Sequence, residues 1–342
     1  MKALVYEGPR DMKMREAEVP APEVGEVLIK VAYSGICGSE LSGYLGHNAL
    51  RKPPLIFGHE FSGTIAAIGE GVAGRPDLLI GARVTANPLV TCGRCSYCLR
   101  GMQQLCAERK LLSAALPGSN AEYVKIPATF VYALPDHVSF QQGALVEPIA
   151  CGVRVAELAA AKPGDRVLIM GMGPIGLFIL QALRVYGVRD VVAVDLNKDR
   201  LEMAEALGAT AVHPKETDTA EAIRAMTGGA GVQVAIDAVG SAATRRVCVE
   251  HCAPGGKVVV TGLHEAESSL QVNHMIRQEI SLSGSFAYSA INFQTALRWL
   301  SEGQIDLRDW TIEAPLEAGQ EWFEKLLGNP GKVAKVLLRP NA

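Results

Sequence analysis

The sequence predicts an α/β protein of two domains: a parallel sheet flanked by helices, and a second domain rich in β-strands. The chain has 342 residues, more than one hydrophobic core usually accommodates. After residue 163, apolar segments of strand length alternate with helical segments, as in a buried parallel sheet. Before that point, short apolar runs are separated by Gly and Pro, which is typical of compact β-structure.

Composition and charge disfavour several classes of function. Hydrophobic residues make up 49% of the chain and charged residues 20%, the balance of a globular protein. The formal net charge is −3 and there is no basic run, so we expect neither nucleic acid nor a membrane as partner. The N-terminus lacks an apolar stretch of signal-peptide length, so we expect a cytoplasmic protein. In that compartment cysteines more often bind metal than form disulfides.

Four runs in the N-terminal region predict strands: KALVYE, EVLIKVAY, GTIAAIG and ARVTA. Residues whose side chains can bind a metal lie around these runs. Cys37 follows the second run, His59 and Glu60 precede the third, and Glu147 lies farther on in ALVEPIACG. Each of these residues alone also fits a packing role. Together, one thiolate, one imidazole and one or two carboxylates are the ligand types of a catalytic zinc, whose exchangeable position admits a substrate oxygen.

Four cysteines lie within the single stretch TCGRCSYCLRGMQQLC: Cys92, Cys95, Cys98 and Cys106. Two-residue gaps let successive thiolates turn back onto one ion, and the longer gap closes a loop around it. Four thiolates suit a tetrahedral zinc, and a closed site of this kind is structural. A redox pair is the alternative for any single Cys-x-x-Cys, but three overlapping cysteines and a fourth favour zinc.

A glycine-rich turn opens the second domain. The segment PGDRVLIMGMGPIGLFILQALRVYG predicts a strand, a tight turn and a helix. Backbone N–H groups at such a turn approach a pyrophosphate. The residues of this turn are Gly171, Gly173, Pro174, Ile175 and Gly176. A second strand, VVAVD, ends at Asp195, where an acidic residue hydrogen-bonds the ribose hydroxyls of a dinucleotide. Its charge favours NAD over NADP, although Lys198 and Arg200 follow closely and would suit a phosphate.

Three further apolar runs predict parallel strands: VQVAIDAVG, GGKVVVTGL and EISLSGSFAY. The tail, from about residue 291, returns to an amphipathic helix and ends in GKVAKVLLRP, a final strand. Periodicity alone does not show which domain this tail joins.

The order of these motifs resembles the zinc-containing medium-chain dehydrogenase/reductase family, in its polyol (sorbitol-type) branch. The resemblance covers nearly the whole chain and rests on GxCGSE, GHEFSG, the four-cysteine lobe, AEYVKIP, ALVEP and the glycine-rich turn. It implies a GroES-like catalytic domain over 1–150 and 291–342, with a structural zinc lobe at about 90–108. It also implies a Rossmann domain over 151–290, two zinc ions per chain, NAD as cofactor, and a homodimer or homotetramer.

The resemblance implies Cys37, His59 and Glu60 as ligands of the catalytic zinc. Glu147 lies at the other candidate position and either ligates directly or alternates with Glu60 or water, a choice that the sequence leaves open.

The resemblance also implies how a proton leaves the substrate. Ser39 matches the position whose hydroxyl contacts the alcohol oxygen and starts a relay. Glu40 matches a carboxylate, usually aspartate, that orients the ligand His59. Many relatives carry a relay histidine where this chain has Ser42, so His47 is the candidate substitute.

The expected activity is therefore zinc-dependent hydride transfer from a secondary alcohol of a polyol-like substrate to NAD. Ala287 stands where sorbitol-type enzymes carry an arginine, which argues against sorbitol itself. The alternatives within the family are a threonine 3-dehydrogenase, a simple alcohol dehydrogenase and a sugar-phosphate alcohol dehydrogenase. An alternative of another class is a non-catalytic protein that binds zinc and a nucleotide.

Overall fold

The computed structural model describes residues 1–72, 74–305, 310–328 and 330–341. The chain forms two compact units. The first unit contains Met1–Glu147, Ser289–Gly303 and the described residues after 309. The second contains Pro148–Tyr288 together with Gln304 and Ile305.

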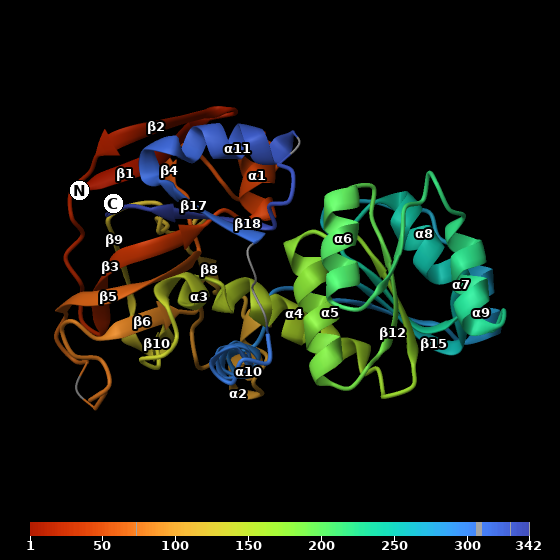
Figure 1. Ribbon diagram of the computed structural model, residues 1–342. Coiled ribbons are helices and arrows are strands. Elements are labelled where there is room, and N and C mark those ends of the chain that lie inside the picture. The colour runs from red at the N-terminus through yellow and green to blue at the C-terminus, as the bar shows by residue number, and fades with distance from the viewer. Residues whose placement is uncertain (73, 306–309, 329, 342) are drawn as a thin grey trace. The chain divides into compact units, whose positions relative to one another are not determined.

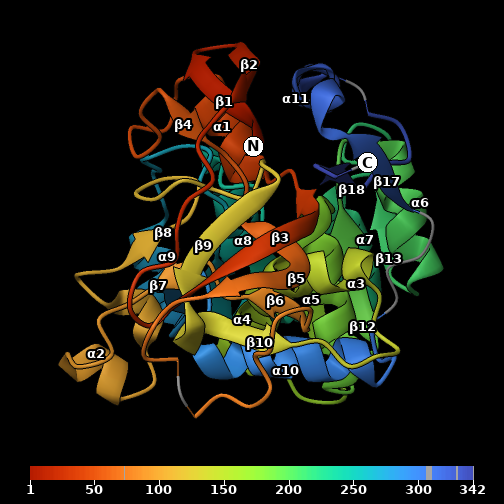
Figure 2. The same cartoon turned by 90° about the vertical axis from the view of Figure 1, so that its left-hand side faces the viewer.

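The first unit is built on a seven-stranded sheet in the order β10-β6-β5-β3-β18-β17, with β9 also paired to β3. Figure 2 shows β9, β3, β5 and β6 side by side. A separate three-stranded sheet has the order β2-β1-β4, and β7 pairs with β8. The strands are β1 (Lys2–Gly8), β2 (Asp11–Glu16), β3 (Glu26–Gly35), β4 (Leu55–Ile56), β5 (Glu60–Ile68), β6 (Arg83–Ala86), β7 (Leu89–Val90), β8 (Lys110–Leu111), β9 (Tyr123–Pro127), β10 (Val131–Ala133), β17 (Thr311–Pro315) and β18 (Lys335–Arg339).

Short helices close this unit. They are α1 (Gly38–Tyr44), α2 (Ser96–Leu99), α3 (Phe140–Ala144), α10 (Ala290–Ser301), α11 (Gly319–Leu327) and the 3₁₀ turns Gln103–Leu105, Ala128–Phe130 and Leu316–Ala318. The chain's last strand, β18, pairs antiparallel with β3, so the C-terminal segment completes the N-terminal sheet. Helix α11 packs against α1, where the rings of Tyr44 and Phe323 lie 5.3 Å apart between their centroids.

The second unit is a six-stranded sheet in the order β13-β12-β11-β14-β15-β16, and each of these strand pairs is parallel. This order places the first strand at the centre, as in doubly wound nucleotide-binding folds. Figure 1 shows α5 and α6 on one face of the sheet and α7, α8 and α9 on the other. The elements are α4 (Val146–Ala159), β11 (Arg166–Met170), α5 (Pro174–Val185), β12 (Asp190–Val194), α6 (Lys198–Ala206), β13 (Thr210–Val212), α7 (Thr219–Thr227), β14 (Val232–Asp237), α8 (Ala242–Glu250), β15 (Cys252–Val260), α9 (Val272–Gln278) and β16 (Ser281–Gly284).

The apolar runs of the sequence explain the central strands of this sheet. Because helices cover both faces of a parallel sheet, its strands bury successive residues instead of alternating ones. The last four residues of β11 and of β12 are all buried. The predicted α/β class, with a parallel sheet and a β-rich unit, is confirmed.

Among the described helices, none combines the length and the apolar content that a membrane span requires.

Candidate functional site

The first candidate metal site lies at the ends of three neighbouring strands. Gly35 ends β3 and is paired with Glu60, the first residue of β5. On the other side of β3, β18 begins at Lys335. Strand pairing therefore brings Glu60, Lys335 and the loop of Cys37 together. A Cβ atom added at Gly35 would lie 2.3 Å from Glu60 Oε2, so the close approach of the two strands requires glycine here.

The side chains of Cys37, His59 and Glu60 form a metal-ligand group, with their ligand atoms within 4.8 Å of one another. A thiolate, an imidazole and a carboxylate are zinc ligands, and three protein ligands leave a fourth position for substrate. His59 Nδ1 lies 2.8 Å from Glu40 Oε1, which leaves Nε2 for the metal. The residues at this site fit a catalytic zinc.

The charge around His59 also suits a cation. Burial disfavours the charged ring, but the carboxylate of Glu40 and the thiol of Cys37 outweigh it and raise the pKa of His59 well above its usual value. The negative surroundings that favour a proton on this ring equally favour a metal ion at Nε2.

Glu40 is fully buried and accepts several hydrogen bonds. Its Oε1 accepts from the backbone N–H of Gly58 at 2.8 Å and from the hydroxyl of Ser113 at 2.5 Å, besides facing His59. Its Oε2 accepts from the backbone N–H of Cys37 at 3.2 Å. Burial alone would raise the pKa of Glu40, yet His59, together with Arg51 and Ser113, lowers it to about 2. Glu40 is therefore an ionised carboxylate that fixes the orientation of the His59 ring.

Glu60 faces a buried lysine. Lys335 Nζ lies 2.6 Å from both carboxylate oxygens of Glu60 and donates to Oε1 and to the carbonyl oxygen of Ile36. Both oxygens of Glu60 therefore face the ammonium group, and a metal bound here would share this carboxylate with Lys335. Burial lowers the pKa of Lys335, but the charges of Glu60 and Cys37 raise it above its usual value. The result is an ion pair with side-chain exposures of 4% and 0%.

Glu147 lies in the first turn of α4 and is buried. It does not belong to the group whose ligand atoms lie within 4.8 Å of one another. Its charge contributes to the raised pKa of Lys335, so it lies close enough to act on the same site electrostatically.

The structure connects Ser39 to the ligand group. The hydroxyl of Ser39 donates to Cys37 Sγ at 3.3 Å, and Arg51 Nη2 donates to Ser39 Oγ at 3.1 Å. The side chain of His47 is exposed, and its ring makes no hydrogen bond or ion pair with the described residues. Ser39 thus contacts the ligand group by a hydrogen bond to Cys37 Sγ, and the ring of His47 makes no such contact with the described residues.

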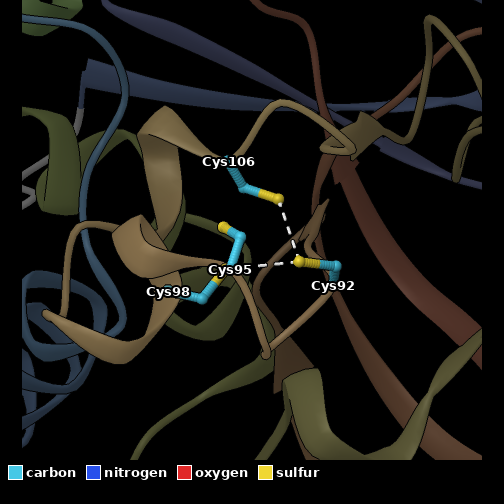
Figure 3. Close-up of side chains that lie close together, drawn as sticks. All are labelled: Cys92, Cys95, Cys98 and Cys106. Carbon is cyan, nitrogen blue, oxygen red and sulfur yellow. Dashed lines mark hydrogen bonds between the residues drawn. The ribbon is translucent and has the colours of Figure 1, made fainter.

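The second candidate metal site is the four-cysteine lobe. Figure 3 shows the side chains of Cys92, Cys95, Cys98 and Cys106 converging from one loop. All four sulfur atoms lie within 4.8 Å of one another, with Cys92 3.9 Å from Cys98 and 3.6 Å from Cys106. A disulfide requires about 2.05 Å. A tetrahedral zinc with Zn–S bonds of about 2.3 Å separates its sulfurs by roughly 3.8 Å, so the spacing fits zinc.

Protonation differs within this lobe. The backbone N–H of Cys98 stabilises the thiolate of Cys95 and lowers its pKa to about 7. Burial raises the pKa of Cys98 to about 11. A metal is bound by thiolates, so metal binding here releases protons.

The glycine-rich turn joins β11 to α5. Gly171 has φ +95°, which suits glycine, and Gly173 caps the helix with Pro174 as its first residue. A Cβ atom added at Gly176 would lie 2.0 Å from the carbonyl oxygen of Gly171, so the turn packs onto the helix only with glycine at that position. The first backbone N–H groups of a helix have no carbonyl partner within it, so those of this turn, which includes Ile175, are donors suited to a pyrophosphate.

Asp195 follows β12 and faces this turn. Its Oδ2 accepts from the backbone N–H of Met172 at 2.7 Å and its Oδ1 from that of Asn197 at 2.8 Å. Arg200 Nη1 lies 3.9 Å from Asp195 Oδ2, and the Arg200 side chain is 33% exposed. The acidic residue expected to read the ribose is therefore fixed beside the glycine-rich turn, with one arginine next to it.

Sequence reasoning did not identify three residues of the first site: Arg51, Ser113 and Lys335. Arg51 and Ser113 belong to loops, and Lys335 begins a strand with no motif of its own. Ser113 has φ +68°, which is uncommon for a residue other than glycine, but no sequence pattern marks it. Each reaches the site through tertiary contacts that no local spacing encodes.

Comparisons with known proteins match both parts of the chain. Residues 23–136 match the family model described as Alcohol dehydrogenase GroES-like domain, and residues 174–302 match the model described as Zinc-binding dehydrogenase. The chain is 35% identical over 349 residues to a protein named sorbitol dehydrogenase from Bacillus subtilis (strain 168), covering 100% of this chain and 98% of that protein.

Two solved structures resemble the fold over nearly its whole length. One is a 2R,3R-butanediol dehydrogenase from Bacillus subtilis, with a TM-score of 0.91, 32% identity and coverage of 99% of each chain. The other, titled a short chain alcohol dehydrogenase, comes from E. coli CFT073 and was solved in complex with the cofactor NADH. It has a TM-score of 0.92, 31% identity and coverage of 99% of each chain.

Proposed function

Because this chain belongs to the zinc-binding dehydrogenase family, we propose that it oxidises a secondary alcohol of a small polyol-like molecule, with NAD as hydride acceptor. The predicted family and the oxidoreductase class are confirmed. The observation that carries the proposal is the group of Cys37, His59 and Glu60, which supplies three ligands of the catalytic kind.

Each residue of this site has a role in the proposal. Cys37, His59 and Glu60 would hold a zinc ion, which would supply Lewis acidity toward the alcohol oxygen. Glu40 holds the Nδ1 proton of His59, which leaves the lone pair of Nε2 available for a metal. Ser39, whose Oγ lies 3.3 Å from Cys37 Sγ and is partly exposed, would accept the proton of the alcohol while it gives its own hydroxyl proton to water.

Glu60 is the third ligand in this proposal, because its carboxylate lies with Cys37 and His59. Glu147 acts on the site through its charge or alternates with Glu60 as a ligand. This proposal leaves His47 out of the relay, because no hydrogen bond among the described residues joins its ring to Ser39.

The choice of NAD over NADP rests on Asp195. Its carboxylate is held beside the glycine-rich turn by two backbone N–H groups, so a 2′-phosphate brought there would meet a fixed negative charge. Arg200 lies beside the same carboxylate and lessens this repulsion without removing it.

The four-cysteine lobe binds the second zinc in this proposal and stabilises its loop without contributing to the chemistry, because four thiolates leave no open position. We further propose a cytoplasmic homodimer or homotetramer, following the resemblance. Light scattering tests the assembly, and a clean monomer would contradict it.

A rival function within the family shares the ligand group and differs only in the pocket: threonine, a simple alcohol or a phosphorylated sugar alcohol would replace the polyol. The discriminating experiment is NADH production against a panel of polyols, sugar acids, threonine and simple alcohols, with and without a chelator. Chelator-sensitive activity on a polyol supports the proposal, and activity only on threonine or a simple alcohol assigns the pocket to that rival. No activity on any alcohol, from protein that holds zinc and NAD, would favour a non-catalytic role.

A further inference from the structure

Arg51 is a buried cation without a counter-ion of its own. The residue is 5% exposed, and no carboxylate in the described part of the chain lies within 4.0 Å of its guanidinium. Its Nη2 donates to Ser39, its Nε is buried without a hydrogen-bond acceptor, and its guanidinium carbon lies 5.8 Å from the ring centroid of Phe57. Buried charges in proteins are nearly always paired, so this arginine lacks a partner that a bound molecule can supply.

Glu40 does not fill that role. The charge of Arg51 helps to lower the pKa of Glu40, but the two side chains form no ion pair within 4.0 Å. The oxygens of Glu40 already receive hydrogen bonds from other groups: the backbone N–H groups of Gly58 and Cys37 and the hydroxyl of Ser113. The negative charge of Glu40 is committed to the orientation of His59.

A glycine in α1 leaves the space that the Arg51 side chain occupies. A Cβ atom added at Gly43, inside α1, would lie 2.4 Å from Arg51 Cδ, so any larger residue at position 43 would displace the side chain. The backbone N–H of Arg51 donates to the carbonyl oxygen of Asn48, which fixes the loop where the side chain begins. The position of the guanidinium is thus built by the helix and by the loop together.

Arg51 is connected to the partly exposed residues of the site. It is one hydrogen bond from Ser39, and Ser39 is one hydrogen bond from Cys37 Sγ. Gly38 is exposed, and Cys37 and Ser39 are partly exposed. A molecule whose hydroxyl reaches Ser39 and the metal therefore places its neighbouring groups within range of the guanidinium.

We propose that Arg51 binds an oxyanion of the substrate, so that the alcohol oxidised here belongs to a molecule bearing a carboxylate or a phosphate. This inference rests on the proposed dehydrogenase function. It narrows the substrate to an acidic alcohol, a class that includes the phosphorylated sugar alcohol named above as a rival. A guanidinium presents forked donors that match the oxygens of either group. The oxyanion supplies both the missing counter-charge and an acceptor for Nε.

The test compares matched substrates with the zinc- and NAD-loaded enzyme. A neutral polyol, the sugar acid of the same carbon skeleton and the corresponding sugar-alcohol phosphate are assayed with wild type, R51M, R51K and K52M. Lys52 is the control, because it is an exposed cation next in sequence. We expect wild type to prefer one of the acidic substrates, and the identity of that substrate distinguishes carboxylate from phosphate.

Loss of the guanidinium should affect the acidic substrates more than the neutral one. A hydrogen-bonded charge pair predicts that R51M lowers kcat/KM about 10- to 100-fold more for the preferred acid than for the neutral polyol. R51K should keep part of the preference, because it retains the charge but not the fork. K52M should leave the preference unchanged. Calorimetric binding of the same acid should weaken in R51M by a similar factor.

A wild-type enzyme that oxidises the neutral polyol at least as well as both acids would overturn the inference and leave the proposed function intact. This comparison needs no variant, so it holds even if R51M does not fold. An equal loss on neutral and acidic substrates in R51M would assign Arg51 to positioning Ser39 instead. Failure to oxidise any alcohol would refute the proposed function itself.

Discussion

Replacing Lys335 by Met removes one partner of a buried ion pair. Lys335 Nζ lies 2.6 Å from both carboxylate oxygens of Glu60 and donates to the carbonyl oxygen of Ile36 at 3.1 Å. Methionine keeps most of the aliphatic stem, so little packing is lost. The substitution therefore isolates the effect of the ammonium group on the charge of Glu60.

Breaking a buried pair by removing one partner costs about 3–5 kcal/mol, because the other charge stays buried and unpaired. We expect a loss of this size in the free energy of unfolding of K335M without added zinc. The double variant K335M/E60Q buries no net charge at this pair. It should therefore recover at least half of the free energy of unfolding that K335M loses. K30M is the control, because Lys30 is an exposed lysine of β3 in the same sheet. It should change the free energy of unfolding by less than about 0.5 kcal/mol.

Zinc adds a second comparison to this experiment. If Glu60 is a metal ligand, a bound cation compensates its charge in place of the ammonium group, so zinc should stabilise K335M more than wild type. Urea unfolding followed by circular dichroism measures both quantities. A loss below about 1 kcal/mol in K335M, or equal losses in the single and double variants, would refute the ion-pair reasoning. An unchanged deficit with zinc would remove Glu60 from the ligand group.

Three further predictions concern other residues. Glu40 has its pKa lowered from 4.5 to about 2, so it stabilises the fold above pH 4.5 and loses that contribution as the pH falls toward 2. The shift corresponds to roughly 3 kcal/mol, and in acid titrations E40Q should lack this loss; an identical acid transition would contradict it. D195A should lower the preference for NAD over NADP about 10-fold or more in kcat/KM, and unchanged selectivity would exclude its role in reading the ribose. C95S should lose one zinc and several kcal/mol of stability while kcat stays within about 3-fold of wild type; a collapse of kcat in folded protein would contradict a purely structural lobe.

The fold class was predictable because its signals are local. The apolar runs around β11 and β12 report burial on both faces of a sheet, and the glycine spacing of the turn reports a strand leading directly into a helix. The pairing of β18 with β3 is not a local property. Periodicity identifies a strand at the end of the chain but does not indicate which strand it joins.

Some residues of the candidate site were also predictable from local motifs, and others were not. Residue types and motifs pointed to Cys37, His59 and Glu60, and the structure brings these three side chains together. No motif pointed to Arg51 or Lys335, because their roles depend on contacts made only after folding. Lys335 meets a carboxylate 275 positions away, and Arg51 meets a serine 12 positions away across a loop and a helix.

The most direct test of the account is the zinc content of purified wild type, C37S and C95S, measured together with chelator-sensitive NADH production. Two sites of different kinds predict two zinc ions per chain in wild type and one in each variant. Activity should be lost in C37S and retained in folded C95S. Full activity and undiminished zinc in C37S would contradict the assignment of Cys37, and with it the catalytic metal site on which the proposed function depends.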